Sequence, residues 1–138
     1  MKLLITSSLL VLFAFRSTPE ITGTLQQKAT AEEKHIAIYF SGSDWCGVCY
    51  KFKQETLAVP EIDSLLNSKF VYYTADFPQR TKLDKPVIAA NEFLAEKLNP
   101  DGNFPLLVIT DANWNIKAVI RRGPGKDEVL SQLQQLVK

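Results

Sequence analysis

The chain has 138 residues, of which 46% are hydrophobic and 22% are charged, with 16 basic and 15 acidic side chains. This length and composition fit one globular domain and leave no surplus for a second hydrophobic core. The near-neutral charge balance argues against a surface built to bind nucleic acid or anionic membranes. One domain is therefore expected to carry the function.

The amino-terminal segment has the pattern of an export signal. Lys2 is followed by an apolar run over 3–15 that polar residues interrupt only briefly. This run is shorter than the ~20 residues that a membrane-spanning helix usually needs, so the pattern favours a signal peptide over a permanent anchor. We assign residues 1–18 to the signal peptide and residues 19–138 to the exported domain, which then has 14 basic and 15 acidic residues.

Helices and strands alternate along the rest of the chain. Residues 17–24 are polar and rich in threonine, which predicts a mobile leader. Apolar spacing and turn residues then predict helices over 25–34, 46–57, 61–67, 87–98 and 127–137. β-prone apolar runs predict strands over 35–40, 70–75, 106–109 and 116–121, and the short connection between the last two indicates a hairpin. This order describes an α/β fold, a mixed central sheet with helices on both faces.

Two cysteines, Cys46 and Cys49, are the only ones in the chain. A disulfide between them closes so short a loop that it removes little entropy from the unfolded chain, so a chemical role explains the pair better than a structural one. The pair follows a predicted strand and a glycine-containing turn, and it begins a predicted helix. Zinc usually takes about four ligands, and beyond the cysteines the chain offers one histidine, His35, and carboxylates. No metal site is expected.

Position at the start of a helix gives the two thiols different predicted roles. The unpaired N–H groups and partial positive charge at a helix start stabilise a thiolate, which makes Cys46 the predicted nucleophile. Thiols in such motifs titrate at roughly 3.5 to 7 instead of ~8.5. Three-residue spacing puts Cys49 one turn further along the same face, so it is predicted to resolve a mixed disulfide formed on Cys46. Trp45 is expected at the loop surface, in contact with an incoming polypeptide.

Residues 45–49, Trp-Cys-Gly-Val-Cys, resemble the active site of the thioredoxin family. Residues 41–46, Ser-Gly-Ser-Asp-Trp-Cys, resemble the version found in exported bacterial thioredoxin-like proteins, and the resemblance extends from about Leu25 to the carboxyl terminus. The Phe104-Pro105 pair stands where this family places a cis-proline facing the disulfide. The resemblance therefore implies a thioredoxin-like fold and a substrate-binding surface that consists of Trp45, Gly47, Val48, Phe104 and Pro105.

The resemblance also implies a function. It points to a thiol–disulfide oxidoreductase that acts on protein thiols and disulfides, is periplasmic or secreted, and needs no bound cofactor. A reductase-like role is implied, with a membrane partner as the source of electrons. Two departures leave the redox direction open: the strand before the motif offers Tyr39 or Phe40 where thioredoxins commonly bury an acidic residue, and the dipeptide between the cysteines is Gly-Val.

Two other hypotheses stay open at this point. The first is a binding or chaperone-like module whose Cys46–Cys49 disulfide is largely inert, which the missing carboxylate and the apolar surroundings of the motif favour. The second is a copper-handling protein that uses the thiol pair and His35. The sequence does not indicate an oligomeric state.

Overall fold

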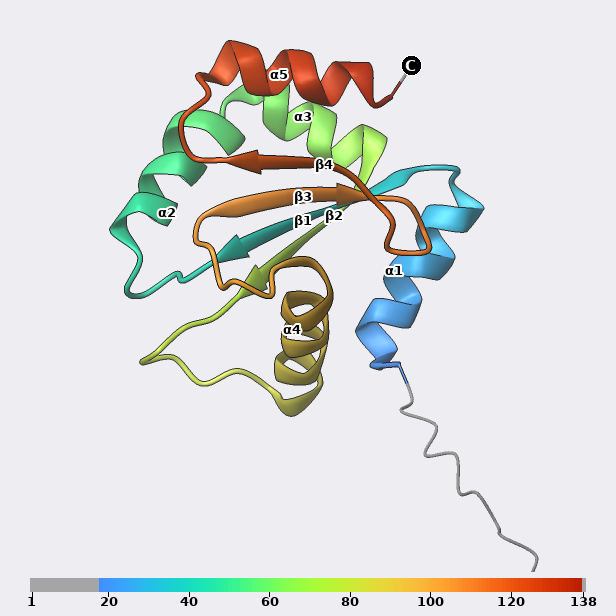
Figure 1. Cartoon of the computed structure of the whole chain (residues 1–138), viewed down its shortest axis with the longest axis vertical. Coiled ribbons are helices and arrows are strands. Elements are labelled where there is room, and N and C mark those ends of the chain that lie inside the picture. The colour runs from blue at the N-terminus through green and yellow to red at the C-terminus, as the bar shows by residue number, and fades with distance from the viewer. Residues whose placement is uncertain (1–17, 138) are drawn as a thin grey trace, which may run out of the picture.

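In the computed structural model, which describes residues 18–137, a four-stranded sheet lies between two layers of helices (Figure 1). The strands are β1 (His35–Ser41), β2 (Phe70–Asp76), β3 (Leu106–Thr110) and β4 (Ile116–Arg121). Their order in the sheet is β2-β1-β3-β4. Strands β1 and β2 run parallel, and β3 runs antiparallel to both β1 and β4. The predicted mixed sheet is confirmed.

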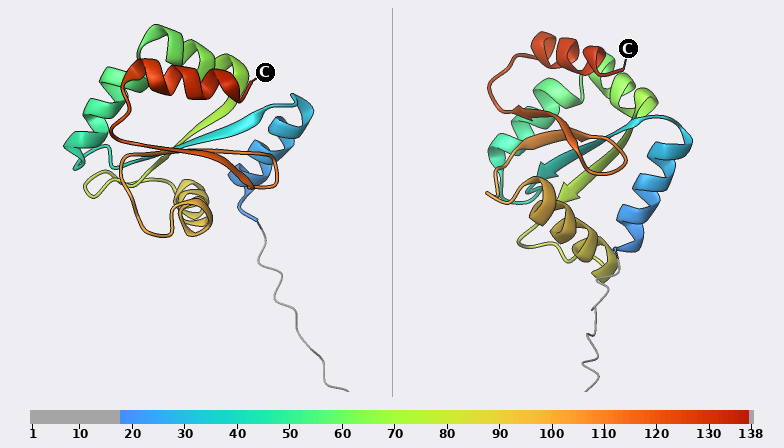
Figure 2. Two further views of the ribbon diagram at one scale, coloured as in Figure 1. Left: turned by 45° about the horizontal axis from the view of Figure 1, so that its top comes forward. Right: turned by 45° about the vertical axis from the view of Figure 1, so that its right-hand side comes forward.

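The helices divide between the two faces of the sheet. They are α1 (Glu20–Ala31), α2 (Gly47–Phe52), α3 (Pro60–Lys69), α4 (Lys85–Leu98) and α5 (Lys126–Gln135), and a π-helical turn, η1 (Lys53–Leu57), continues α2. Helices α1 and α4 cover one face, and α2, α3 and α5 cover the other (Figures 1 and 2). None of the helices within residues 18–137 is long and apolar enough to cross a membrane.

Strand β1 is buried on both faces, which explains its continuous apolar sequence. Because side chains alternate along a strand, Ile36, Ile38 and Phe40 pack in the core beneath α1 and α4. Ala37 and Tyr39 point the other way, into the core beneath α3 and α5. This alternation directs the Tyr39 side chain toward the layer that contains α2.

Three loops meet at one edge of the sheet because of the strand register. Ser41 pairs with Asp76, so the parallel strands β1 and β2 end together. Strand β3 runs the opposite way, and its first residue, Leu106, pairs with Phe40. The loop after β1, the 77–84 loop after β2 and the 99–105 loop before β3 therefore converge at this edge.

The predicted mobile leader over 17–24 is wrong from Glu20 onward, where α1 begins. The helix packs against α4 and is stabilised locally, since the buried Thr22 hydroxyl donates a hydrogen bond to the Pro19 carbonyl at 2.7 Å. Threonine is a weak helix former in isolation, and tertiary packing overrides that preference here. The predicted signal peptide covers residues 1–18, and all of it except residue 18 lies outside the described residues.

Candidate active site

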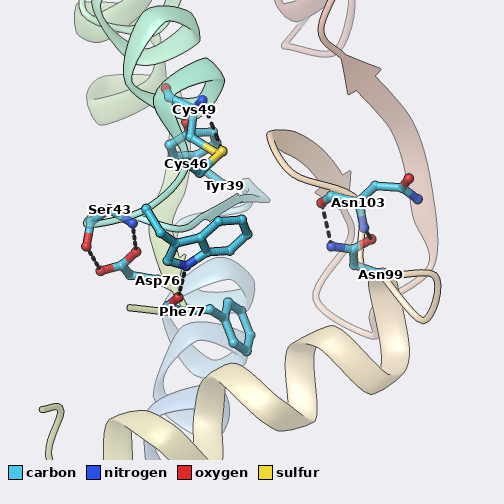
Figure 3. Close-up of a disulfide and its surroundings, with 9 residues drawn as sticks. Tyr39, Ser43, Cys46, Cys49, Asp76, Phe77, Asn99 and Asn103 are labelled. Atoms are coloured by element: carbon cyan, nitrogen blue, oxygen red, sulfur yellow. Dashed lines mark hydrogen bonds between the residues drawn. A yellow bond between two sulfur atoms is a disulfide. The ribbon is translucent and has the colours of Figure 1, made fainter. Parts of the chain in front are cut away.

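Cys46 and Cys49 form a disulfide at the start of α2, with their Cα atoms 5.2 Å apart (Figure 3). Cys46 is the residue that caps the helix, and its sulfur accepts a hydrogen bond from the backbone N–H of Cys49 at 3.2 Å. Cys46 is 8% exposed, whereas Cys49 is 1% exposed. The structure thus makes Cys46 the more accessible of the two residues and gives its sulfur one of the otherwise unpaired N–H groups of a helix start.

The residue beneath Cys49 is Tyr39. Its buried hydroxyl donates a hydrogen bond to the carbonyl oxygen of Cys49 at 2.9 Å. Burial raises the pKa of Tyr39 to about 12, against the weaker opposing effect of a hydrogen bond from the Ser41 side chain. Tyr39 therefore stays protonated at neutral pH and acts as a donor. Phe40, the other residue expected at this point, packs on the opposite face of the sheet.

The loop before the disulfide is joined to the end of β2 by a carboxylate. The Asp76 side chain accepts hydrogen bonds from the backbone N–H of Ser43 at 2.8 Å and from its hydroxyl at 2.5 Å (Figure 3). Asp76 is the last residue of β2 and Ser43 comes two residues after β1. This pair therefore links the ends of the two neighbouring parallel strands.

The next residue, Asp44, holds the 77–84 loop. Its carboxylate accepts hydrogen bonds from three consecutive backbone N–H groups, those of Gln79, Arg80 and Thr81, at 2.8, 2.8 and 2.9 Å. These hydrogen bonds, that from Gln79 first, lower the pKa of Asp44 to about 2. The Asp44 charge is therefore satisfied by the backbone of the neighbouring loop.

Trp45 lies against two phenylalanines. Its indole Nε1 donates a hydrogen bond to the Phe77 carbonyl at 2.7 Å, and its ring meets Phe104 edge-on with centroids 5.6 Å apart. Phe77 also meets Phe104 edge-on at 5.6 Å. A Cβ at Gly42 would overlap the indole, so this position needs glycine because of close approach. Trp45 remains 41% exposed despite these contacts, as expected for a surface residue of the loop.

The loop before β3 completes the edge. The Phe104-Pro105 bond is cis, as the family resemblance implied. Asn99 and Asn103 hold this loop through two hydrogen bonds: the Asn99 side-chain amide donates to the Asn103 carbonyl, and the Asn103 N–H donates to the Asn99 Oδ1, both at 2.9 Å (Figure 3). Pro105 is buried next to the first residue of β3. The loop geometry thus depends on the side chain of Asn99.

Two of the remaining candidates lie at the site and one does not. Gly47 and Val48 are exposed at the start of α2, beside the disulfide. His35 begins β1 and lies at the opposite end of the strand from the cysteines, so the histidine and the thiols are not brought together. Within residues 18–137, no group of three or more His, Cys, Asp and Glu side chains is arranged to hold a metal ion.

Sequence reasoning missed Asp76, Phe77 and Asn99 as parts of the site. Each of the three comes at or just after the end of a strand or helix. For Asp76 and Asn99 the available signal was that polar residues at such positions commonly bond to nearby backbone, whereas Phe77 gave no such signal. Their partners lie 4 to 33 residues away along the chain, and the more distant ones follow only from the strand register.

Comparison with known proteins assigns the family. Residues 24–125 match the thioredoxin-like domain, and the chain belongs to that family. Among curated proteins, the disulfide bond reductase DsbH of Chlamydia pneumoniae is 30% identical over 94 residues, which cover 68% of this chain and 56% of that protein. The chain therefore spans little more than half the length of this relative.

Two solved structures show the same fold. A structure of a DsbH oxidoreductase superimposes with a TM-score of 0.74 at 24% identity and covers 82% of this chain and 78% of its own. The reduced carboxy-terminal domain of DsbD from Neisseria meningitidis superimposes with a TM-score of 0.64 at 13% identity, covering 87% of this chain and 96% of its own. At these identities the likeness establishes the fold alone.

Proposed function

We propose that this chain is a thiol–disulfide oxidoreductase that reduces disulfides in protein substrates outside the cytoplasm. The observation that carries the proposal is the Cys46–Cys49 disulfide at the start of α2. Its more accessible cysteine, Cys46, caps the helix. The relationship to a protein named as a disulfide bond reductase supports the direction of the reaction.

The reaction proceeds through two thiol–disulfide exchanges. In the reduced protein, the thiolate of Cys46 attacks one sulfur of a substrate disulfide; a mixed disulfide forms, and the other substrate sulfur leaves as a thiolate that takes up a proton. Cys49 then loses its proton and attacks the Cys46 sulfur, which releases the second substrate thiolate. The substrate gains two electrons and two protons, and the protein ends with the disulfide seen here.

Strand β1 supplies no carboxylate for the proton of Cys49, because Tyr39 occupies the position beneath it and stays protonated. This proton therefore passes to solvent or to the departing substrate thiolate. The next cycle needs a dithiol reductant to return two electrons to the protein, and we assign this task to a membrane-bound electron donor. No bound cofactor takes part, since the two sulfurs hold the electrons.

Residues on both sides of the disulfide bind the substrate in this account. Trp45, Gly47 and Val48 are next to the cysteines in the chain, and Phe104, whose ring contacts Trp45, and Pro105 directly precede β3. An extended substrate segment lies between the two sides and pairs with the backbone beside Pro105. The assignment of residues 1–18 as a signal peptide and 19–138 as the exported domain accounts for a location in the periplasm or outside the cell.

Trapping of the mixed disulfide tests the proposal. The Cys49→Ser variant should accumulate a covalent adduct with a disulfide-containing protein substrate, visible on a non-reducing gel and removed by dithiothreitol. The Cys46→Ser variant should form none and serves as the matched control. If the Cys46→Ser variant exchanges as fast as the parent protein, or if Cys49→Ser forms no adduct while folded, the proposed mechanism is wrong and an inert binding module explains the site better.

A further inference from the structure

A cavity of about 520 Å³ opens between the 77–84 loop and α4. Its volume lies within the ~300–1,000 Å³ range of pockets that hold ligands. The lining is mainly apolar and includes Phe77, Pro78, Leu83 and Ile88. Ile88 is 40% exposed on α4, so an apolar occupant would remove carbon surface from water on both partners.

This cavity continues the surface that flanks the disulfide. Phe77 is one of its walls, and the same ring meets Phe104 edge-on at 5.6 Å, while the Phe77 carbonyl accepts the hydrogen bond from Trp45. Figure 3 shows Phe77 together with the disulfide and Asp76 at this end of the sheet. A segment that crosses Trp45 and Phe104 therefore reaches the cavity without leaving the protein surface.

Large exposed apolar side chains lie at both ends of this path: Trp45 directly before the disulfide and Ile88 in the lining of the cavity. Val48 and Tyr50 are also exposed, on α2. The other two within residues 18–137, Ile116 and Val119, lie on the edge strand β4 at the other side of the sheet. An apolar surface that joins a reactive disulfide to a cavity indicates a binding site for an apolar partner.

Hydrogen bonds fix both walls of the cavity. The 77–84 loop is held by the three backbone N–H groups that donate to Asp44. On the α4 side, the buried Asn91 donates to the Asp76 carbonyl at 2.7 Å and accepts from the Tyr73 hydroxyl at 2.7 Å. Since these hydrogen bonds already order the walls, binding of an occupant does not cost the free energy of ordering them.

We propose that this cavity binds a large apolar side chain of the polypeptide substrate, in the extended segment that carries the reacting cysteine. The inference rests on the proposed function and deepens it, because it names the substrate class: an unfolded or extended chain with an apolar residue near its cysteine. Lys82 and Lys85 line the cavity together with Glu92 and Asp76, so two basic and two acidic side chains balance there and the apolar part of the lining selects the occupant.

Peptide disulfides of matched sequence test the proposal. Each peptide carries one cysteine as a mixed disulfide with glutathione. A second position holds either leucine or serine, and the series places this position at increasing distances before and after the cysteine. Hydroxyethyl disulfide, which is too small to reach the cavity, reports the chemistry alone. We expect one leucine position to lower KM about tenfold or more relative to serine, the size expected for burial of one such side chain.

The Ile88→Asn variant and its control, Ile116→Asn on β4, separate the cavity from the rest of the surface. With rates normalised to each protein's own rate with hydroxyethyl disulfide, Ile88→Asn should lose the leucine preference and Ile116→Asn should keep it. Equal KM values for the leucine and serine peptides, or an unchanged preference in Ile88→Asn, overturn the cavity proposal and leave the oxidoreductase proposal in place.

A binding measurement covers the case in which the oxidoreductase proposal itself fails. If the protein reduces neither the peptides nor hydroxyethyl disulfide, the leucine peptide with serine in place of its cysteine is labelled and its binding is followed by fluorescence polarisation. Weaker binding to Ile88→Asn than to the parent protein and to Ile116→Asn supports the cavity. Equal binding to all three proteins refutes it.

Discussion

The hydroxyl of Tyr39 donates a hydrogen bond to the carbonyl oxygen of Cys49 at 2.9 Å, from a strand in which resemblance to thioredoxins led us to look for a carboxylate. A tyrosine with its pKa raised to about 12 holds its proton throughout the physiological range, so it positions Cys49 without acting as a base. The carbonyl also accepts the backbone N–H of Lys53, as part of the helix. The resolving cysteine is thus fixed by two donors.

Tyr39→Phe tests the positioning role. The variant loses one buried hydrogen bond, so its free energy of unfolding should fall by about 0.5–1.5 kcal/mol, as measured by denaturant titration. The pH profile of the resolving step, followed by stopped-flow decay of a preformed mixed disulfide, should keep its shape because Tyr39 does not transfer a proton. Tyr73→Phe removes a comparable hydroxyl bond to Asn91 and is the control. A lost or shifted ionisation in Tyr39→Phe alone would show that the hydroxyl takes part in proton transfer.

Asp44→Ala should loosen the 77–84 loop without unfolding the domain. The backbone N–H groups of Gln79, Arg80 and Thr81 lose their acceptor, and amide hydrogen exchange at these three positions should accelerate, since they become free to bond to water. Exchange in β1 should stay slow. Glu96→Ala, which removes an exposed carboxylate on α4, provides the matched control and should leave loop exchange unchanged. Unchanged protection of all three amides in Asp44→Ala would contradict the role assigned to this carboxylate.

The same loop should respond to acid. Hydrogen bonds lower the pKa of Asp44 from 3.8 to about 2, so the folded protein binds this proton less readily than the unfolded chain. The contribution of Asp44 to stability is therefore fully present above about pH 4 and is lost as the pH falls toward 2. The chemical shifts of the three loop amides should report a titration near pH 2. A midpoint near 4 would mean that the carboxylate does not hold the loop in solution.

Gly42→Ala should displace Trp45. The added methyl group overlaps the indole, so the ring has to move and its hydrogen bond to the Phe77 carbonyl should break. The Trp45 Nε1–H signal in a ¹⁵N-correlated NMR spectrum should shift and exchange faster with solvent. Gly23→Ala in α1, where an added Cβ meets nothing within 4 Å, should leave that signal in place. An unperturbed Trp45 signal in Gly42→Ala would refute the close approach.

Local sequence patterns predicted most of the fold because apolar runs and turn residues report directly on buried strands and helix ends. The strands over 70–75 and 116–121 match β2 and β4 to within one residue. Helix α1 was missed at its first turns, since its threonines disfavour a helix locally and only packing against α4 makes one. Such packing depends on the whole fold and leaves little trace in a short window of sequence.

The site likewise has features that could be predicted from the sequence and features that could not. The Cys46–Cys49 pair and its position at a helix start follow from spacing, and the cis bond before Pro105 follows from family resemblance. The partners of Asp44 and Trp45 do not, because they lie more than 30 residues away, on a loop brought close only by the register of β1 with β2. Long-range hydrogen bonds of this kind become visible only when the strands are placed.

Equilibration of the Cys46–Cys49 pair against glutathione and dithiothreitol buffers, with free thiols counted at each potential, tests the central claim most directly. The account predicts a reversible two-electron transition at a reducing potential, near the ~−270 mV of thioredoxin. A transition near ~−120 mV would contradict the reductase direction, since that potential belongs to a strong oxidant. A pair that never equilibrates would contradict thiol–disulfide exchange itself.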